Sequence, residues 1–183
     1  MNYAEVEQIK QKLKQDLPER TFLHTLRTVQ MAMELCVGTN ANRDTVFLAA
    51  LLHDCAKKDV PTEEHLEKIS DFADCSKVIH APLGAIKAEE EFGIFDKKIL
   101  DCIRFHTTGR PKMSIEEMIV FLADAIEDGR EYDGVEEIRK KTKISIKDGV
   151  LKSLENVVRF DSSNGNKIHH LTIETIKDLK GEN

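Results

Sequence analysis

Four histidines and two aspartates occupy positions where the helical pattern of this chain would otherwise place apolar core residues. His53 and Asp54 end the longest apolar run, Val46–Leu52 (VFLAALL), and Asp124 interrupts another, residues 118–125 (MIVFLADA). A buried carboxylate costs several kcal/mol unless a cation, a hydrogen bond or a metal ion compensates it. Two carboxylates and several imidazoles that enter one core from separate helices would stabilise each other around a divalent cation. The four histidines are His24, His53, His80 and His106.

Neutral imidazole and carboxylate groups suit iron, manganese, cobalt or zinc, and the order of metal affinities alone does not choose among them. Adjacent helical residues project about 100° apart, so His53 and Asp54 can approach one ion, or one ion and its neighbour. The alternative is a hydrogen-bonded His/Asp network in the core without metal. The four cysteines (36, 55, 75 and 102) form no C-x-x-C pair and are expected as small core residues. Only Cys55 stays an outside candidate for a ligand.

The composition is that of one soluble globular domain, with 183 residues, 40% of them hydrophobic and 33% charged. A net charge of −6 argues against a general nucleic-acid surface but leaves room for a small polyanion in a local basic pocket. The longest apolar run has 7 residues, and a membrane helix needs about 20. The first residues are charged and periodic, unlike a signal peptide. We therefore expect a cytoplasmic protein without a membrane partner.

Helical periodicity runs through nearly the whole chain, and no segment alternates with period two for long enough to predict a strand. VFLAALL alone could be a buried strand, but its alanines and leucines and the length of its segment favour a helix. Ser114 and Glu117 form a predicted capping box. The fold class is therefore all-α. The helices are expected at residues 21–37, 43–57, 62–72, 83–92, 96–105, 114–128, 135–141, 145–160 and 171–180.

The order His24, His53-Asp54, Asp124 resembles the H…HD…D pattern of HD-domain metal-dependent phosphohydrolases. Over nearly the whole chain the sequence is similar to the bacterial YqeK family. The blocks that carry this resemblance are HDCAKK (53–58), HAPLGA (80–85), FHTTGRPKMS (105–114), FLADAIEDGR (121–130) and IHHLTIET (168–175). It implies a single HD-domain helical bundle over residues 1–183. The metal ligands would lie in a core at about 20–130, and the C-terminal helices, 131–183, would close the nucleotide pocket.

The resemblance also implies an activity, the symmetrical hydrolysis of diadenosine tetraphosphate to two ADP by metal-activated water. The implied metal is iron, with manganese, cobalt or zinc as alternatives, and the implied metal ligands are His24, His53, Asp54 and Asp124. His80 and His106 would either ligate a second metal or contact the phosphates and protonate the leaving group.

Several basic and hydroxyl side chains are expected to contact the substrate. Lys57, three residues after Asp54, can reach a phosphate, or it is a solvated residue that offsets the helix dipole. Arg27 is expected to brace an acidic ligand, and Arg130 to clamp a phosphate. The expected catalytic residues are Asp54, Lys57, His80 and His106. The expected substrate contacts are His24, Arg27, His80, His106, Thr107, Thr108, Gly109, Asp124, Arg130, Lys167, His169 and Thr172. His170 and Asp128 depart from the family pattern, which often has proline at both positions.

Three alternatives share parts of this evidence. Another HD phosphohydrolase, acting on nucleoside monophosphates or deoxynucleoside triphosphates, would use the same metal ligands. A non-catalytic nucleotide sensor would keep the pocket, and a purely structural helical domain would bind no metal. The expected partners are a dinucleoside polyphosphate substrate and an ADP- or GDP-like product, with no nucleic acid and no membrane. The sequence leaves open a homodimer, the number of metal ions and the choice between adenine and guanine.

Overall fold

The computed structural model describes residues 3–182, and over these residues the chain is helical and has no strand, which confirms the all-α prediction. None of the helices in this part of the chain is long and apolar enough to cross a membrane. The helices are α1 (Tyr3–Asp16), α2 (Glu19–Leu35), α3 (Arg43–Leu52), α4 (Glu63–Lys68), a 3-10 turn η1 (Ser70–Phe72), α5 (His80–Phe92), α6 (Lys97–Arg104), α7 (Ile115–Ile126), α8 (Val135–Thr142), α9 (Ile146–Ser163) and α10 (His170–Lys180).

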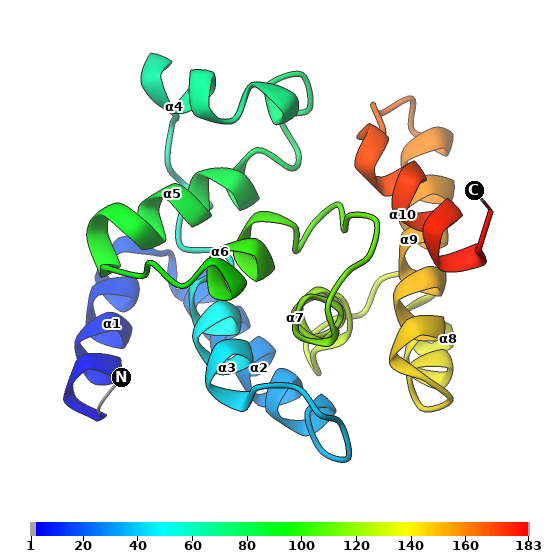
Figure 1. Ribbon diagram of the computed structural model, residues 1–183, viewed down its shortest axis with the longest axis horizontal. Coiled ribbons are helices and arrows are strands. Elements are labelled where there is room, and N and C mark those ends of the chain that lie inside the picture. The colour runs from blue at the N-terminus through cyan, green and yellow to red at the C-terminus, as the bar shows by residue number, and fades with distance from the viewer. Residues whose placement is uncertain (1–2, 183) are drawn as a thin grey trace.

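Helix α7 lies in the middle of the molecule and is seen end-on in Figure 1, with α1–α6 on one side and α8–α10 on the other. Its residues Ile119 and Val120 belong to the apolar cluster that α1, α2, α3, α5 and α6 share. Phe121 and Leu122 belong to a second cluster, with α8, α9 and α10. The predicted capping box is confirmed, because Ser114 and Glu117 exchange side-chain and backbone hydrogen bonds at its first turn. Both halves of the molecule therefore pack on α7.

Helix α3 is shorter than the sequence analysis predicted. The predicted helix ran to Lys57, whereas α3 ends at Leu52 and residues 53–58 form successive tight turns. In these turns the backbone N–H of Cys55 donates to Leu52 O (3.0 Å) and that of Lys57 to Asp54 O (3.0 Å). The apolar run does lie in the core, since α3 is buried from Val46 to Leu52 except for Phe47. Asp54 and Lys57 therefore lie on a turn rather than on one face of a regular helix.

Two other predicted boundaries differ from the structure. The segment expected as one helix over residues 62–72 is divided into α4 and η1. Helix α5 begins at His80, three residues before the predicted start at Leu83. In both cases a buried side chain lies at the boundary, because Phe72 is the last residue of η1 and His80 is the first residue of α5.

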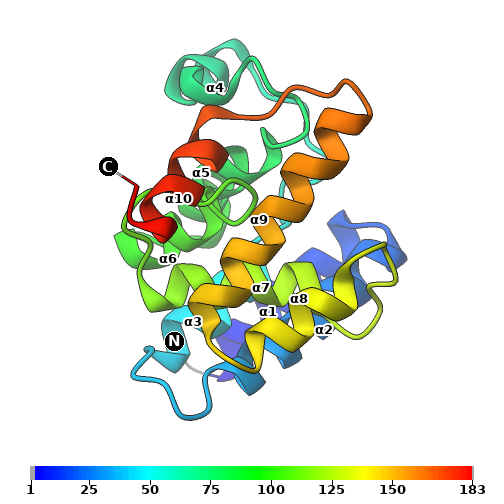
Figure 2. The same cartoon turned by 90° about the vertical axis from the view of Figure 1, so that its right-hand side faces the viewer.

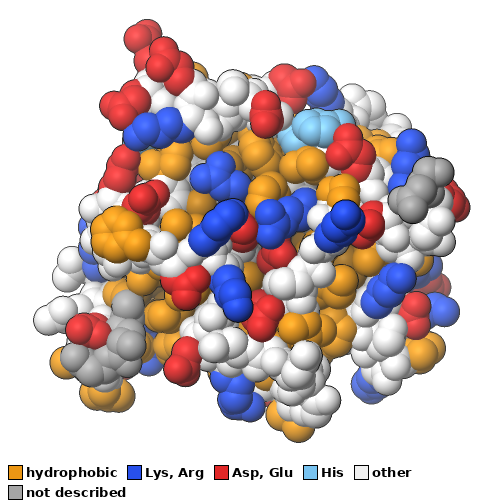
Figure 3. All heavy atoms as spheres, in the orientation of Figure 1, with side chains coloured by type: hydrophobic (Ala, Val, Ile, Leu, Met, Phe, Trp, Pro, Cys, Tyr) orange, Lys and Arg blue, Asp and Glu red, His pale blue; other side chains and the backbone are white. Residues whose placement is uncertain are grey.

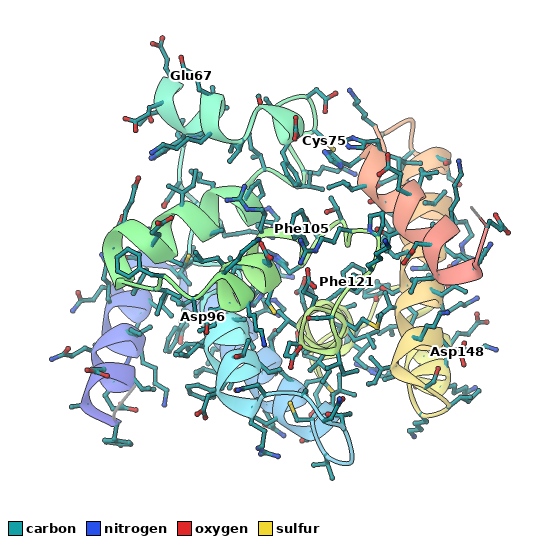
Figure 4. All side chains as sticks on the ribbon, viewed as in Figure 1. Glu67, Cys75, Asp96, Phe105, Phe121 and Asp148 are labelled. Atoms are coloured by element: carbon teal, nitrogen blue, oxygen red, sulfur yellow. The ribbon has the colours of Figure 1, made fainter. Side chains whose placement is uncertain are left out.

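The segment before α5 is joined to the start of α10. The ring of His169 stacks on Phe72 with centroids 4.7 Å apart, and its Nε2 lies 2.9 Å from Asp71 O. Cys75 Sγ donates to Lys167 O (3.7 Å), and Figure 4 shows Cys75 in the loop beside α10. Figure 2 shows α9 crossing the molecule next to α10, with α8 beside its lower end. These contacts hold the C-terminal layer against the rest of the chain.

Gly149 permits the close approach of α9 to α8 and α7. A Cβ atom at this position would collide with Thr142 Oγ1 and lie 3.0 Å from Thr142 Cα and 3.1 Å from Leu122 Cδ1. We expect Gly149→Ala to lower the free energy of unfolding by roughly 1–2 kcal/mol, because overpacking outweighs the helix propensity gained. Urea denaturation followed by circular dichroism measures this change. The control is Lys147→Ala on the exposed face of α9, and equal stability of the two variants would contradict the packing argument.

Candidate metal centre

Three segments bring His24, His53, Asp54 and Asp124 to one point. His24 comes from α2, His53 and Asp54 from the turn after α3, and Asp124 from α7. His24 Nε2 lies 2.9 Å from Asp124 Oδ1, 3.3 Å from His53 Nε2 and 3.9 Å from Asp54 Oδ2. His53 Nε2 lies 3.6 Å from Asp54 Oδ2 and 3.7 Å from Asp124 Oδ1. Atoms that all carry lone pairs thus converge in a buried space.

The second oxygen of Asp54 faces a different group of side chains. Asp54 Oδ1 lies 3.3 Å from His80 Nε2, 3.6 Å from His106 Nε2 and 3.2 Å from Lys57 Nζ. Lys57 Nζ also lies 2.9 Å from His80 Nε2. Two sets of three side chains have ligand atoms within 4.8 Å of one another, His24–His53–Asp124 and His53–Asp54–His106. The arrangement therefore offers two overlapping positions for a metal ion.

The imidazoles are oriented by hydrogen bonds at Nδ1. His53 Nδ1 lies 2.8 Å from Ala50 O and His106 Nδ1 lies 2.7 Å from Ile103 O, so Nδ1 carries the proton and Nε2 the lone pair. Such bonds to carbonyl or carboxylate oxygens orient the histidine ligands of metal sites. His106 Nε2 is buried and has no hydrogen-bond partner. A buried acceptor without a donor is costly, and a cation would satisfy it, so the donor set fits a divalent metal.

Burial and neighbouring charges set the protonation of these groups. Burial lowers the pKa of His53 to about 4, which keeps its imidazole neutral at pH 7 and able to ligate a metal. Burial alone would raise the pKa of Asp54, but the surrounding polar groups of His53, His80 and Lys57 hold it well below its usual value. The pKa of Asp124 is also lowered, since the hydrogen bond from His24 outweighs burial. The centre thus combines ionised carboxylates with the neutral imidazole of His53.

Glu127 is a residue that the sequence analysis missed. It is 1% exposed, and its carboxylate accepts hydrogen bonds from His24 Nδ1 (3.1 Å), Arg27 Nε (2.5 Å) and Gly129 N (2.6 Å). Burial would raise its pKa, but the Arg27 and Gly129 hydrogen bonds lower it to about 2. Arg27 does brace an acidic group, but that group is Glu127, and through it Arg27 orients the ring of His24. The one feature of the sequence that could have pointed to Glu127 is its position three residues after Asp124.

The remaining predicted substrate contacts divide into two groups. Arg130 lies at the centre, where its guanidinium donates to the side chain (2.5 Å) and the backbone O (2.8 Å) of Asp124. Thr107 Oγ1 is buried without a partner beside His106. Thr108 donates to Gly109 O (2.9 Å), and Gly109 has a φ of +64°.

The C-terminal candidates make their hydrogen bonds elsewhere. Lys167 pairs with Asp74 at the surface, His169 bonds to Asp71 O, and the backbone N of Thr172 donates to His169 O. These three side chains stay predicted substrate contacts.

The cysteines behave as core residues, and all four are buried and free. Cys55 Sγ donates to Gly84 O (3.4 Å), and burial raises the pKa of its thiol. A neutral thiol engaged with a carbonyl is a poor metal ligand, because the thiolate is the form that binds metals.

Comparison with known proteins identifies the family. The HD domain profile matches residues 21–129. The chain is 37% identical to the symmetrical bis(5'-nucleosyl)-tetraphosphatase of Halalkalibacterium halodurans, over 92% of this chain and 94% of that protein. The chain belongs to the YqeK-like family of HD-domain proteins.

Another YqeK-like relative, the Bacillus subtilis symmetrical bis(5'-nucleosyl)-tetraphosphatase, is 34% identical over 81% of this chain and 83% of its own. A crystal structure of a predicted HD superfamily hydrolase involved in NAD metabolism, from Clostridium acetobutylicum, superposes with a TM-score of 0.89 at 34% identity. The superposition covers 97% of this chain and 98% of the Clostridium acetobutylicum chain. The fold is therefore shared with that crystal structure over nearly the full length of both chains.

Glu127→Gln tests whether Glu127 orients His24. We expect the metal affinity to fall about 10- to 100-fold, because an uncharged amide neither polarises the His24 ring nor balances Arg27 as the carboxylate does. Competition with a chromogenic chelator measures the affinity. The control is Glu131→Gln, an exposed glutamate four residues away. Wild-type metal affinity in the Glu127 variant would contradict this role.

Proposed function

We propose that this protein is a metal-dependent phosphohydrolase that cleaves diadenosine tetraphosphate symmetrically into two ADP. The observation that carries the proposal is the convergence of His24, His53, Asp54 and Asp124 on one point in a chain of this family. Two relatives at 37% and 34% identity are named for that activity. A purely structural domain would not require two ionised carboxylates beside the buried, neutral imidazole of His53.

The proposed cofactor is a divalent ion held by His24, His53, Asp54 and Asp124, and iron is the proposed metal. Manganese, cobalt and zinc accept the same nitrogen and oxygen ligands. When bound, such an ion supplies Lewis acidity towards a water molecule and the phosphate oxygens. The proposal includes a second ion. Its ligands would be His53, Asp54 and His106, with His80 beside them.

The chain's own residues position the phosphates and the protons. Lys57 has a side chain that is 42% exposed, while its Nζ contacts Asp54 and His80, so the ammonium group faces both the centre and the solvent. It can neutralise an incoming phosphate, and its pair with His80 holds a proton close to the leaving oxygen. Arg130 presents a permanently charged, planar donor beside Asp124. Figure 3 shows basic side chains gathered across the middle of one face, over α5, α6 and the following loop.

The products of hydrolysis test the proposed activity. Protein purified anaerobically and loaded with iron should convert diadenosine tetraphosphate into ADP alone, detected by anion-exchange chromatography. Asp54→Asn should lose this turnover, because the amide supplies no charge to either set of ligands, while circular dichroism shows that the fold is kept. ATP and AMP as products would contradict symmetrical cleavage. An intact substrate in the presence of metal-loaded wild type, or turnover only of nucleoside monophosphates or deoxynucleoside triphosphates, would contradict the activity.

The neighbouring lysines provide a matched pair of variants. Lys57→Ala should lower kcat about 100-fold, since a charge placed at the reacting phosphate is typically worth that much, and should keep the wild-type metal content. Lys58→Ala removes an exposed lysine of the same turn and should keep the wild-type kcat. Steady-state kinetics of the two variants measure the difference. Equal kcat values for the two variants would show that Lys57 is only a solvated residue of the turn.

A further inference from the structure

The loop between α6 and α7, residues 105–114, carries His106 and Thr107. Each has a buried polar atom, His106 Nε2 and Thr107 Oγ1, without a hydrogen-bond partner among the described residues. The first of these atoms lies 3.6 Å from Asp54 Oδ1 and belongs to a candidate set of metal ligands. The position of this loop therefore decides where a candidate metal ligand lies.

The backbone of this loop adopts conformations that most side chains disfavour. Gly109 has a φ of +64°, which suits a glycine. Lys112 has a φ of +60° and is the one residue other than glycine with a positive φ in the described part of the chain. A strained conformation of this kind persists only where the surrounding structure imposes it. Contacts from neighbouring elements must therefore hold the loop.

Arg110 supplies such contacts to three places at once. Its Nη2 donates to Asp101 Oδ2 of α6 (3.1 Å), and its Nε lies 2.6 Å from Glu117 Oε1 of α7. Its guanidinium carbon lies 4.7 Å from the centroid of the Phe105 ring, and Figure 4 labels Phe105 at the start of the loop. A planar guanidinium can serve two carboxylates and a ring face together.

The contact with Phe105 closes a short segment of the loop. The backbone N–H of Gly109 also donates to Phe105 O (2.9 Å). His106 and Thr107 lie between these two ends in the sequence, so both are inside the closed segment. Arg110 therefore limits how far either of them can move.

Glu117 is the buried partner that fixes Arg110. It is 3% exposed, and its second oxygen, Oε2, accepts from the backbone N–H of Ser114 (2.7 Å) in the capping box of α7. A buried carboxylate needs a compensating cation, which Arg110 provides. Glu117 precedes Asp124 by seven residues on α7, so the two lie on the same side of that helix. Arg110 thus connects the helix of Asp124 with the loop of His106.

We propose that Arg110 is a positioning residue of the metal centre, which holds His106 Nε2 towards Asp54 through its ion pair with Glu117. No hydrogen bond or ion pair joins Arg110 to a candidate metal ligand within residues 3–182, so Arg110 acts through the loop. The inference rests on the proposed function for the reaction that this loop serves.

Steady-state hydrolysis of diadenosine tetraphosphate by the metal-loaded protein measures the effect on the reaction. Arg110→Met keeps an unbranched apolar side chain and removes the charge. It should lower kcat roughly 10- to 100-fold, because a small displacement of a reacting group costs that much, and should leave KM nearly unchanged. Glu117→Gln keeps the capping box, which accepts glutamine, and should lower kcat to the same extent. The double variant should be no slower than either single variant, since both remove one interaction.

The matched control removes the other cation at Asp101. Lys97 is an exposed residue of α6 whose Nζ pairs with Asp101 Oδ2 (2.7 Å), and it makes no ion pair with Glu117. Lys97→Met should therefore keep the wild-type kcat. A loss in Lys97→Met equal to that in Arg110→Met would overturn the inference, because the charge balance of Asp101 would then explain both.

Imidazole nitrogen NMR of the metal-free protein measures the position of His106 without turnover. Arg110→Met and Glu117→Gln should shift or broaden the His106 signals and leave those of His24 unchanged, with circular dichroism as the check on folding. Unchanged His106 signals would overturn the inference whatever the kcat, and so would a wild-type kcat in both variants or a common change at His24 and His106. Displaced His106 signals alone, in a protein whose wild type leaves diadenosine tetraphosphate intact, would support the positioning role and overturn the proposed function.

Discussion

Asp54 places a carboxylate in the interior of a helical core, where its side chain is only 4% exposed, and much of the structure follows from compensating this charge. Its Oδ2 faces His24 and His53, and its Oδ1 faces His80, His106 and Lys57. Removing a carboxylate from water is costly unless several partners surround it. Segments from α2, α5, α6 and α7 must therefore meet at the end of α3. The candidate metal centre lies where this requirement is satisfied.

The compensation continues outwards through pairs of charges. Asp124 is paired with Arg130, and His24 is held by Glu127, which is paired with Arg27. Arg139 from α8 extends the network, since it donates to the backbone oxygens of Ile126, Glu127 and Arg130. Each group stabilises the one closer to the centre, until the side chains of Arg27 and Arg130 reach solvent. The loop after α7 is thus ordered by polar contacts and connects the centre to the C-terminal helices.

What the sequence could predict depends on how local the deciding interaction is. The helices from α2 onwards were predictable because their apolar periodicity is local, whereas α1 (Tyr3–Asp16) was not among the predicted helices. His53 and Asp54 were identifiable because they end an apolar run. The end of α3 at Leu52 was not, because the turn that follows it is shaped by the side chains that meet Asp54 from distant segments. Glu127 was not identified from the sequence, because its burial depends on Arg27, 100 positions away. The stacking of His169 on Phe72 is equally non-local.

The candidate metal ligands all come from the part of the chain that ends with α7. The HD domain profile ends at residue 129, and every candidate metal ligand lies before that point. A cavity of about 610 Å³ is lined by His106 and Asp124 and also by Tyr132 and α9, which lie after residue 129. Both halves pack on α7, which carries Asp124 on the side of the centre and Phe121 in the cavity wall. A substitution on α9 therefore leaves the geometry of the candidate metal ligands intact, because none of the groups that could hold a metal includes a residue of α9.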